Sequence, residues 1–262
     1  MKLLLGIVLY NPNEDEIEKV NKYQNYSMVK QVVIFDNSPE SNENKIDNIN
    51  RDYNWSGQNM GLAVPYNKII EVAKQDGYDY ACILDQDSFF SENQLCNMIE
   101  IIEGRENEEE DTVLYVPYWD KRNPNKGDLV EIVDYAINSG SFINIKRLSQ
   151  IKIEYDEKIF LDGLDYDFCW SIREQGGKIR MIHSVQLEHR VGESISKSDF
   201  DHHTSERYYL IAHNKKYIWK KHKGFKGSIL AFVSNIKLLF VILFYENDKG
   251  GKLLKCLKGM ID

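Results

Sequence analysis

The chain has 262 residues, of which 42% are hydrophobic and 28% are charged, and this ordinary globular composition excludes a disordered protein. The length suits one large α/β domain, alone or with an appendage. The net charge of −8 argues against a general nucleic-acid-binding protein, which would carry a basic surface.

The charge is distributed unevenly along the chain. Residues 215–262 contain 11 lysines and 3 acidic residues, a net charge of +8, so the first 214 residues carry −16. An acidic body followed by a basic tail predicts a main domain at 1–214 and a C-terminal tail at 215–262 that meet different partners. The four cysteines form no CxxC pair, which favours free thiols in a reducing cytoplasm over a zinc site or disulfides.

Apolar periodicity in the first 105 residues predicts alternating strands and helices. The expected elements, in chain order, are a strand at 3–10, a helix at 15–26, a strand at 31–36, a helix at 65–75, a strand at 80–84 and a helix that begins at Ser91. The N-terminal apolar run has no small-residue cleavage site after it, so it favours a buried strand over a signal peptide. Such alternation predicts a mainly parallel sheet that binds ligands beyond the carboxyl ends of its strands.

The second half of the chain continues with strands and then becomes helical. Strands are expected at 112–119, 141–145 and 178–189, and a helix is expected at 167–175, where Gly176 and Gly177 would end it. From residue 204 onward helical patterns dominate.

Polar residues follow the predicted strands, where other nucleotide-binding proteins would show a glycine-rich loop. Neither GxxxxGK[ST] nor GxGxxG is present, so P-loop and Rossmann dinucleotide sites lose their main support. Asp85 and Asp87 leave the strand at 80–84, and two carboxylates at this spacing can bind one hard divalent cation. The alternative is an Asp-rich turn in which the carboxylates accept backbone hydrogen bonds.

A second acidic cluster, formed by Asp162, Asp165 and Asp167, lies at the start of a predicted helix. Three carboxylates this close repel one another unless a cation or a substrate needs them. One of them, held near a metal-bound phosphate, can serve as a general base. The alternative is that these are acidic residues favoured at a helix N-terminus by the helix dipole.

The chain resembles the inverting, metal-dependent family 2 glycosyltransferases with the GT-A fold, and among them the bacterial rhamnosyltransferase group of O-antigen and capsule assembly. The matching segments occur in order over about residues 3–220: Val8-Leu-Tyr-Asn-Pro12, Phe35-Asp-Asn-Ser38, Asn59-Met-Gly-Leu-Ala63 with Asn67, Leu84-Asp-Gln-Asp87, Asn138-Ser-Gly-Ser141, Phe160 to Arg173, and His189-Arg-Val-Gly192. The resemblance implies an α/β fold with a mixed, mainly parallel sheet flanked by helices, followed here by a C-terminal helical extension.

The resemblance also implies a role for individual residues in binding a nucleotide-diphosphate sugar. The nucleobase side would be formed by Tyr10, Asn11 and Asp36, the nucleoside would lie along Asn59 and Gly61, and Asp85 would lie near the ribose. Asp87 would ligate Mg²⁺ or Mn²⁺ on the diphosphate, with His189 as a second ligand. For His189 the alternative is a histidine that only caps its strand.

Asp165 occupies the position at which the family has its catalytic base, while Asp162 and Asp167 would contact the acceptor or orient the helix. The chain departs from the family pattern at His213-Asn214, where relatives often have Arg-Asn. A phosphate contact made by that arginine would be lost here or supplied by Arg207 instead.

The expected function is therefore metal-dependent, inverting transfer of a sugar from a nucleotide-diphosphate donor to a hydroxyl of a growing surface glycan. The resemblance implies L-rhamnose from dTDP-rhamnose as the donor. Two alternatives stay open: a transferase that uses a UDP-hexose, and a non-catalytic module of the same fold that binds a nucleotide sugar or a cation.

The tail contains an apolar stretch at 228–245 with lysines on both sides. Ser234, Asn235 and Lys237 make a bilayer span unfavourable, whereas a lysine-flanked apolar helix is typical of a segment that lies in an anionic membrane surface. The alternative is a helix pair that packs on the domain or on a second subunit of a homodimer. A membrane surface would bring the enzyme to a lipid-linked acceptor, so the expected location is cytoplasmic and peripheral, on the inner face of the plasma membrane.

Overall fold

The computed structural model describes the whole chain except residues 48, 106–107, 120–124 and 190–202. These described residues form two compact units. The first unit comprises Met1–Tyr155 and Phe168–Val191, and the second comprises Asp156–Asp167 and Gly192–Asp262. The boundary expected at 214/215 falls inside a helix of the second unit, α6 (Ser205–Tyr245).

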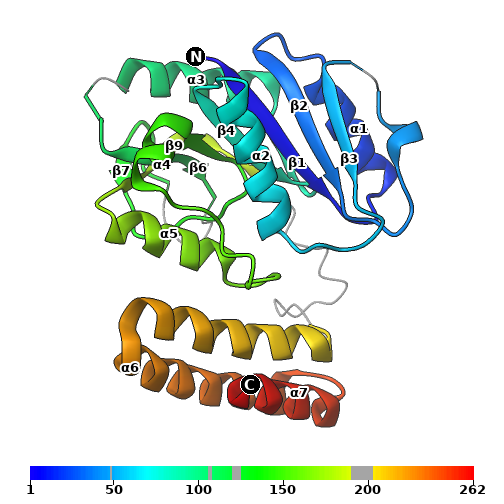
Figure 1. Ribbon diagram of the computed structural model, residues 1–262, viewed down its shortest axis with the longest axis vertical. Coiled ribbons are helices and arrows are strands. Elements are labelled where there is room, and N and C mark those ends of the chain that lie inside the picture. The colour runs from blue at the N-terminus through cyan, green and yellow to red at the C-terminus, as the bar shows by residue number, and fades with distance from the viewer. Residues whose placement is uncertain (48, 106–107, 120–124, 190–202) are drawn as a thin grey trace. The chain divides into compact units, whose positions relative to one another are not determined.

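Among the described residues, the first unit contains an eight-stranded sheet with helices on both faces (Figure 1). Its elements are β1 (Leu3–Leu9), α1 (Glu14–Tyr23), β2 (Val29–Asp36), the 3-10 turn η1 (Glu43–Lys45), β3 (Arg51–Trp55), α2 (Ala63–Gln75), β4 (Tyr80–Asp85), β5 (Ser88–Phe89), α3 (Glu92–Arg105), β6 (Thr112–Tyr118), β7 (Val130–Ile132), β8 (Ser141–Asn144), α4 (Ile145–Ile151), β9 (Lys178–Gln186) and β10 (Glu188–His189). Helix α5 (Leu164–Glu174) begins in the second unit and ends in the first.

The strand order is β3-β2-β1-β4-β8-β6-β9-β7. The pairs β3–β2, β2–β1, β1–β4 and β6–β9 are parallel, whereas β8 and β7 pair antiparallel with their neighbours. This arrangement confirms the predicted mixed, mainly parallel sheet.

The position of β1 between β2 and β4 explains its continuous apolar sequence, because every residue of this strand is buried. Successive residues of a strand point to opposite faces of the sheet, and the two faces of β1 meet different helices. Leu5 belongs to a buried cluster with Ile17 of α1 and Leu95 of α3. On the other face Gly6 admits α2, since a Cβ at this position would lie 2.4 Å from the Ile69 side chain. Helices cover both faces of β1, so a ligand would meet this part of the sheet at the ends of the strands.

Five described elements of the first unit were not expected from the sequence: η1, β3, β5, β7 and α4. β3 and β7 are the two edges of the sheet, so they are only half-buried or exposed, and neither contains a continuous apolar run. The strand expected at 141–145 stops at Asn144, whose side chain accepts a hydrogen bond from the Arg147 backbone N–H (3.0 Å) and so starts α4. The helix expected from residue 167 begins earlier, at Leu164.

The second unit contains α6 and α7 (Lys249–Ile261) and confirms the predicted C-terminal helical extension. α6 is two helices, because Gly224 (φ 57°, ψ −139°) reverses the chain. Figure 1 shows the two halves, at 205–223 and 225–245, running side by side. Asn235 donates to the Ala212 carbonyl (3.1 Å), and Tyr208 donates to the Glu246 carboxylate (2.7 Å), so the halves are joined along their length.

Candidate functional site

The carboxyl ends of the parallel strands β1 to β4 meet at one edge of the first unit. Leu9 pairs with Asp36, Asp36 pairs with Trp55, and Val8 pairs with Asp85, so the four strands end at one level. β2 and β3 extend from one side of β1 and β4 lies on its other side, which is the kind of switch point where open α/β sheets bind ligands. We call the loops after these strands the strand-end site; its residues are Tyr10, Asn11, Asp36 to Ser38, Trp55, Asn59 to Gly61, and Asp85 to Asp87.

The Asp36 side chain is buried beneath the strand-end site and does not face solvent. Its fully buried carboxylate accepts hydrogen bonds from the backbone N–H groups of Ser38 and Asn42 (both 2.9 Å) and from the Tyr53 hydroxyl. Burial disfavours the charge, but these hydrogen bonds outweigh burial and hold the pKa of Asp36 below its ordinary value. Burial and the bond to Asp36 raise the pKa of Tyr53 to about 12. The geometry therefore makes Asp36 a positioning residue for the loop after β2.

Two exposed aromatic side chains lie on loops that hydrogen bonds fix in place. The Gln86 side chain accepts from the Tyr10 backbone N–H (2.6 Å) and donates to the Tyr10 carbonyl (3.2 Å), while the Tyr10 side chain stays 47% exposed. The Trp55 indole N–H donates to the Ser38 carbonyl (2.9 Å), and this residue is 50% exposed. Trp55 was missed in the sequence because β3 carries no apolar run that would have revealed its register.

The loop before α2 is tied to the loop after β2. Asn37 donates through its side chain to the Gly61 carbonyl (2.8 Å), and the Gly61 N–H donates to the Asn59 side chain (2.9 Å). Gly61 has φ +74°, a left-handed conformation that favours glycine. At the next loop, Ser38 accepts through its hydroxyl from the Asn11 backbone N–H (2.8 Å). The structure thus brings Asn11, Asn59 and Gly61 together through the Asn37-Ser38 pair.

Asp85 and Asp87 are half-buried at the end of β4. The Asp85 carboxylate accepts from the Tyr66 hydroxyl (2.7 Å), and its backbone N–H donates to Ser139 (2.9 Å). His189 lies opposite Ser88 in the β5–β10 pair, so its backbone is beside the residue that follows Asp87; its side chain lies outside the described part.

No group of three or more metal-binding side chains occurs within the described residues. The donor chemistry still fits Mg²⁺ or Mn²⁺, because the carboxylate oxygens of Asp85 and Asp87 are the hard ligands that these ions take in proteins, with further positions filled by substrate phosphates.

The acidic cluster belongs to the second unit, where two of its members are held in ion pairs. Asp162 accepts two hydrogen bonds from the Arg207 Nε (3.2 Å) and a third from its Nη2 (3.0 Å). Asp167 is 1% exposed and pairs with the Lys221 ammonium and the His222 Nε2, both at 2.8 Å. Asp165 lies between them in the first turn of α5 and is half-buried. The geometry therefore assigns Asp162 and Asp167 to fixing the start of α5.

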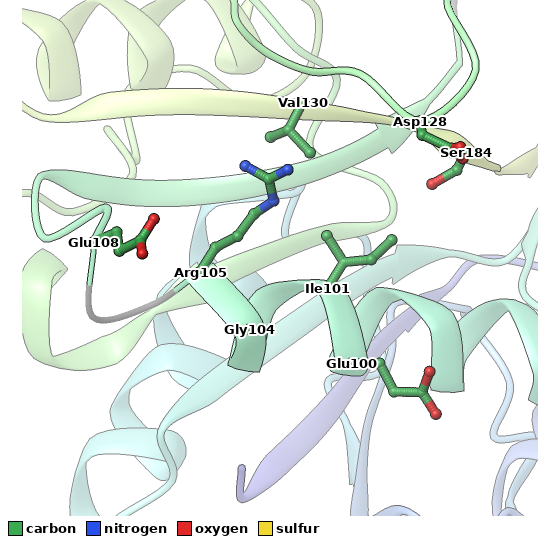
Figure 2. Close-up of a pocket in the computed structure, with 8 residues that line it drawn as sticks. All are labelled: Glu100, Ile101, Gly104, Arg105, Glu108, Asp128, Val130 and Ser184. Carbon is green, nitrogen blue, oxygen red and sulfur yellow. The ribbon is translucent and has the colours of Figure 1, made fainter.

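A pocket of about 500 Å³ lies elsewhere in the first unit, beside the C-terminal end of α3. Figure 2 shows Ile101 and Arg105 of α3 reaching toward Val130 of β7, with Glu100 and Glu108 also on its rim. None of the residues predicted from the sequence lines it. Open α/β sheets bind ligands beyond the carboxyl ends of their strands, so we place the candidate site at the strand ends.

No protein-family model matches the sequence, and no curated protein sequence matches it. Solved structures do resemble it. TarS of S. aureus, residues 1–349, in complex with UDP-GlcNAc matches with a TM-score of 0.60 and 15% identity over 100% of this chain and 81% of that chain. GalNAc-T7 with UDP, GalNAc and Mn²⁺ matches with a TM-score of 0.54 and 14% identity over 72% of this chain and 44% of that chain. Both are GT-A glycosyltransferases, and at these identities the likeness establishes that this chain has the GT-A fold.

Proposed function

We propose that the protein is an inverting glycosyltransferase that moves a sugar from a nucleotide-diphosphate donor to a hydroxyl of a glycan acceptor. The observation that carries the proposal is the pair Asp85 and Asp87 at the end of β4, beside the switch point of a GT-A sheet and flanked by loops that present Tyr10 and Trp55. A sheet of this kind binds its ligand at that edge, and the polar groups there suit a nucleotide diphosphate.

We assign donor recognition to the strand-end site. The exposed rings of Tyr10 and Trp55 offer flat apolar surfaces for a nucleobase, and Asn11 lies on the same loop as Tyr10. Asn59 and Gly61 would lie along the nucleoside and Asp85 near the ribose. Asp36 supports the loop instead of contacting the base itself, because its carboxylate is buried and hydrogen-bonded within the protein.

Asp87 would hold Mg²⁺ or Mn²⁺, with His189 as the proposed second ligand. The ion supplies positive charge that stabilises the leaving diphosphate. Arg207 is the proposed phosphate contact, and to reach a phosphate it would exchange its carboxylate partner Asp162 for the new anion, since a guanidinium pairs with either group in the same bidentate geometry.

Asp165 is the proposed general base. It takes the proton of the acceptor hydroxyl as the oxygen attacks the anomeric carbon, while the bond from that carbon to the diphosphate oxygen breaks on the opposite face. One carboxylate suffices for this single displacement, so the product has inverted configuration and no covalent intermediate forms. Asp167, held by Lys221 and His222, keeps the helix that carries Asp165 in place, and Asp162 holds Arg207 before the donor binds.

The first candidate donor is dTDP-L-rhamnose, on the strength of the sequence motifs, and the acceptor is a growing surface glycan of the O-antigen or capsule kind. A UDP-hexose is the second candidate, because the structural neighbours TarS and GalNAc-T7 were solved with UDP-GlcNAc and with UDP and GalNAc. A non-catalytic module of the same fold would bind one of these donors without turnover.

A panel of dTDP- and UDP-sugars tests the proposal. With Mn²⁺ present, the cognate donor should raise the melting temperature of the protein and be consumed when acceptor is added. Asp87→Asn should abolish the metal-dependent part of donor binding in calorimetric titration. Glu100→Gln, on the rim of the α3 pocket, is the matched control and should bind donor normally. Unchanged metal-dependent affinity in Asp87→Asn would remove Asp87 from the site, and binding without turnover would favour the non-catalytic module.

A further inference from the structure

The second half of α6 is apolar on both of its sides. Its inner side is buried through Gly227, Ala231, Asn235 and Ile242. Its other side, together with α7, exposes a set of large apolar side chains that we call the outer apolar face: Phe225, Ile229, Leu230, Phe232, Val233, Ile236, Phe240, Leu243, Phe244, Tyr245, Leu254, Leu257 and Ile261.

A face of this kind requires an apolar partner. Helices on the surface of a soluble domain turn polar residues toward water, and contiguous exposed apolar patches on such proteins are small. Here the solvent side of a helix of about six turns carries phenylalanine, leucine and isoleucine instead. The partner can be a bilayer, a second copy of the chain or another apolar surface.

The charge around the face selects among these partners. Residues 215–245 contain no acidic residue, and the exposed lysines of the second half of α6 and of α7 are Lys226, Lys237, Lys249 and Lys258, while Lys255 is paired with Glu206. Glu246 adds no negative charge to the surface, because it is buried and paired with Lys252 and Tyr208. Two copies meeting through this face would bring two lysine-bearing surfaces together, whereas anionic lipid headgroups would attract the lysines.

The chain reversal at Gly224 limits how deeply the second half of α6 can enter a bilayer. Among the described helices, α6 is long and apolar enough to cross a membrane, judged by its length and composition alone. Its second half, however, is bonded along its length to the first half, which carries Arg207, Lys216, Lys220 and Lys221. A crossing would draw these charges into hydrocarbon, where they are strongly disfavoured. If the second half of α6 lies flat on the membrane, the first half stays in water and only the outer apolar face enters the bilayer.

We propose that the outer apolar face and its lysines form an interfacial docking surface for an anionic lipid bilayer. The second half of α6 and α7 lie in the plane of the membrane with their outer side chains at the boundary between headgroups and acyl chains. This binding is independent of the proposed sugar transfer, since it is measured on lipid with no sugar present.

The test uses the full chain and vesicles of equal parts phosphatidylglycerol and phosphatidylcholine, with pure phosphatidylcholine vesicles as the comparison. The protein should sediment with the anionic vesicles and bind neutral ones much more weakly. High salt should release it, because screening shortens the reach of the lysine charges. Replacing Lys226 and Lys258 by glutamine should weaken binding to anionic vesicles by about fivefold per lysine and leave the weak neutral binding unchanged.

A triple variant separates apolar insertion from charge. Phe232→Ser, Phe240→Ser and Phe244→Ser together should reduce partitioning by on the order of a hundredfold. Because these side chains are exposed, circular dichroism should show unchanged helix content. The matched control is Ile132→Ser on β7, since Ile132 is 52% exposed and Phe232 is 57% exposed; it should bind vesicles like the parent chain.

Three results would overturn the proposal. Full vesicle binding by the triple variant would show that the outer apolar face takes no part. A chain that ignores both kinds of vesicle and forms a dimer, which the triple variant abolishes in sedimentation equilibrium, would make a second copy the occupant. Retention after both high-salt and alkaline washes would indicate a helix that crosses the bilayer.

Discussion

At the scale of single residues, the acidic cluster divides into one proposed base and two anchors. Asp165→Asn should reduce transfer by about 10²–10⁴-fold while donor affinity hardly changes, because the lost interaction belongs to the transition state. Asp167→Asn should instead affect stability, because Asp167 is buried beside Lys221 and His222. Transfer rate and donor affinity should be measured on the same preparations.

The control variants are Asp167→Asn and Asp162→Asn. Removing one partner of a buried ion pair destabilises a protein by about 3–5 kcal/mol, so Asp167→Asn should lower the urea midpoint of the second unit. The Asp162–Arg207 pair is more exposed, and its loss should cost only about 0–1 kcal/mol. Undiminished transfer in Asp165→Asn would eliminate it as the base, and equal loss of transfer in all three would mean that the cluster works as a unit.

A second residue-scale prediction concerns the Tyr53 hydroxyl bound to Asp36. Tyr53→Phe should lower stability by about 1–2 kcal/mol at neutral pH. Because the pKa of Asp36 is lowered in the folded state, its contribution is present above the unfolded pKa and is lost as the pH falls through the folded value. The pKa of Tyr53 is raised to about 12, so its contribution is present below its unfolded pKa and is lost as the pH rises through about 12.

The stability difference between parent and Tyr53→Phe should therefore be widest at intermediate pH and shrink toward both extremes. Urea unfolding at a series of pH values measures it. Tyr10→Phe, which removes a hydroxyl from an exposed ring, is the control and should be neutral throughout. A difference that stays constant across the pH range would show that the bond does not depend on the charge of Asp36.

At the scale of elements, burial decided which ones could be predicted from the sequence. β1, β2 and β4 are covered on both faces, and their apolar runs reveal them. β3 forms by pairing with β2 and contributes no apolar run, so it was missed, and with it Trp55. The carboxylates after β4 were predictable because they directly follow a buried strand, whereas hydrogen bonds such as that of Tyr66 to Asp85 join residues far apart in the chain.

The reversal within α6 also escaped prediction, because Gly224 lies in a lysine-rich stretch between two helical patterns, and a glycine there is weak evidence of a turn. Gly224→Ala should destabilise the second unit by about 1–3 kcal/mol, since its φ of 57° with ψ of −139° is open almost only to glycine. Gly227 is equally constrained by space, since a Cβ there would lie 1.8 Å from the Trp219 carbonyl oxygen.

Gly250→Ala is the matched control for this change. Gly250 lies in α7 with open space around it and no positive φ, so alanine should leave stability unchanged or raise it by up to about 1 kcal/mol. Thermal unfolding followed by circular dichroism compares the two. An unaffected melting temperature in Gly224→Ala would mean that the chain does not need the reversal.

At the scale of the whole molecule, the separation of charge along the chain gives a prediction that combines both proposals. Transfer to an acceptor carried on anionic vesicles should slow as salt rises, because the Debye length falls from about 10 Å at 0.1 M to about 3 Å at 1 M. Transfer to a soluble acceptor of the same structure should change little. Equal salt dependence on both acceptors would place the effect in donor binding and not in membrane docking.

The edges of the eight-stranded sheet have a further consequence for the behaviour of the protein at high concentration. An open sheet ends in strands with unpaired backbone groups, which can recruit the edge of another molecule and start aggregation. In the described sheet one edge is β3, with Arg51 and Asp52 along its short length, and the other is β7, only three residues long. The charged residues that make β3 hard to recognise in the sequence thus also make this edge of the sheet unfavourable for pairing with a strand of another molecule.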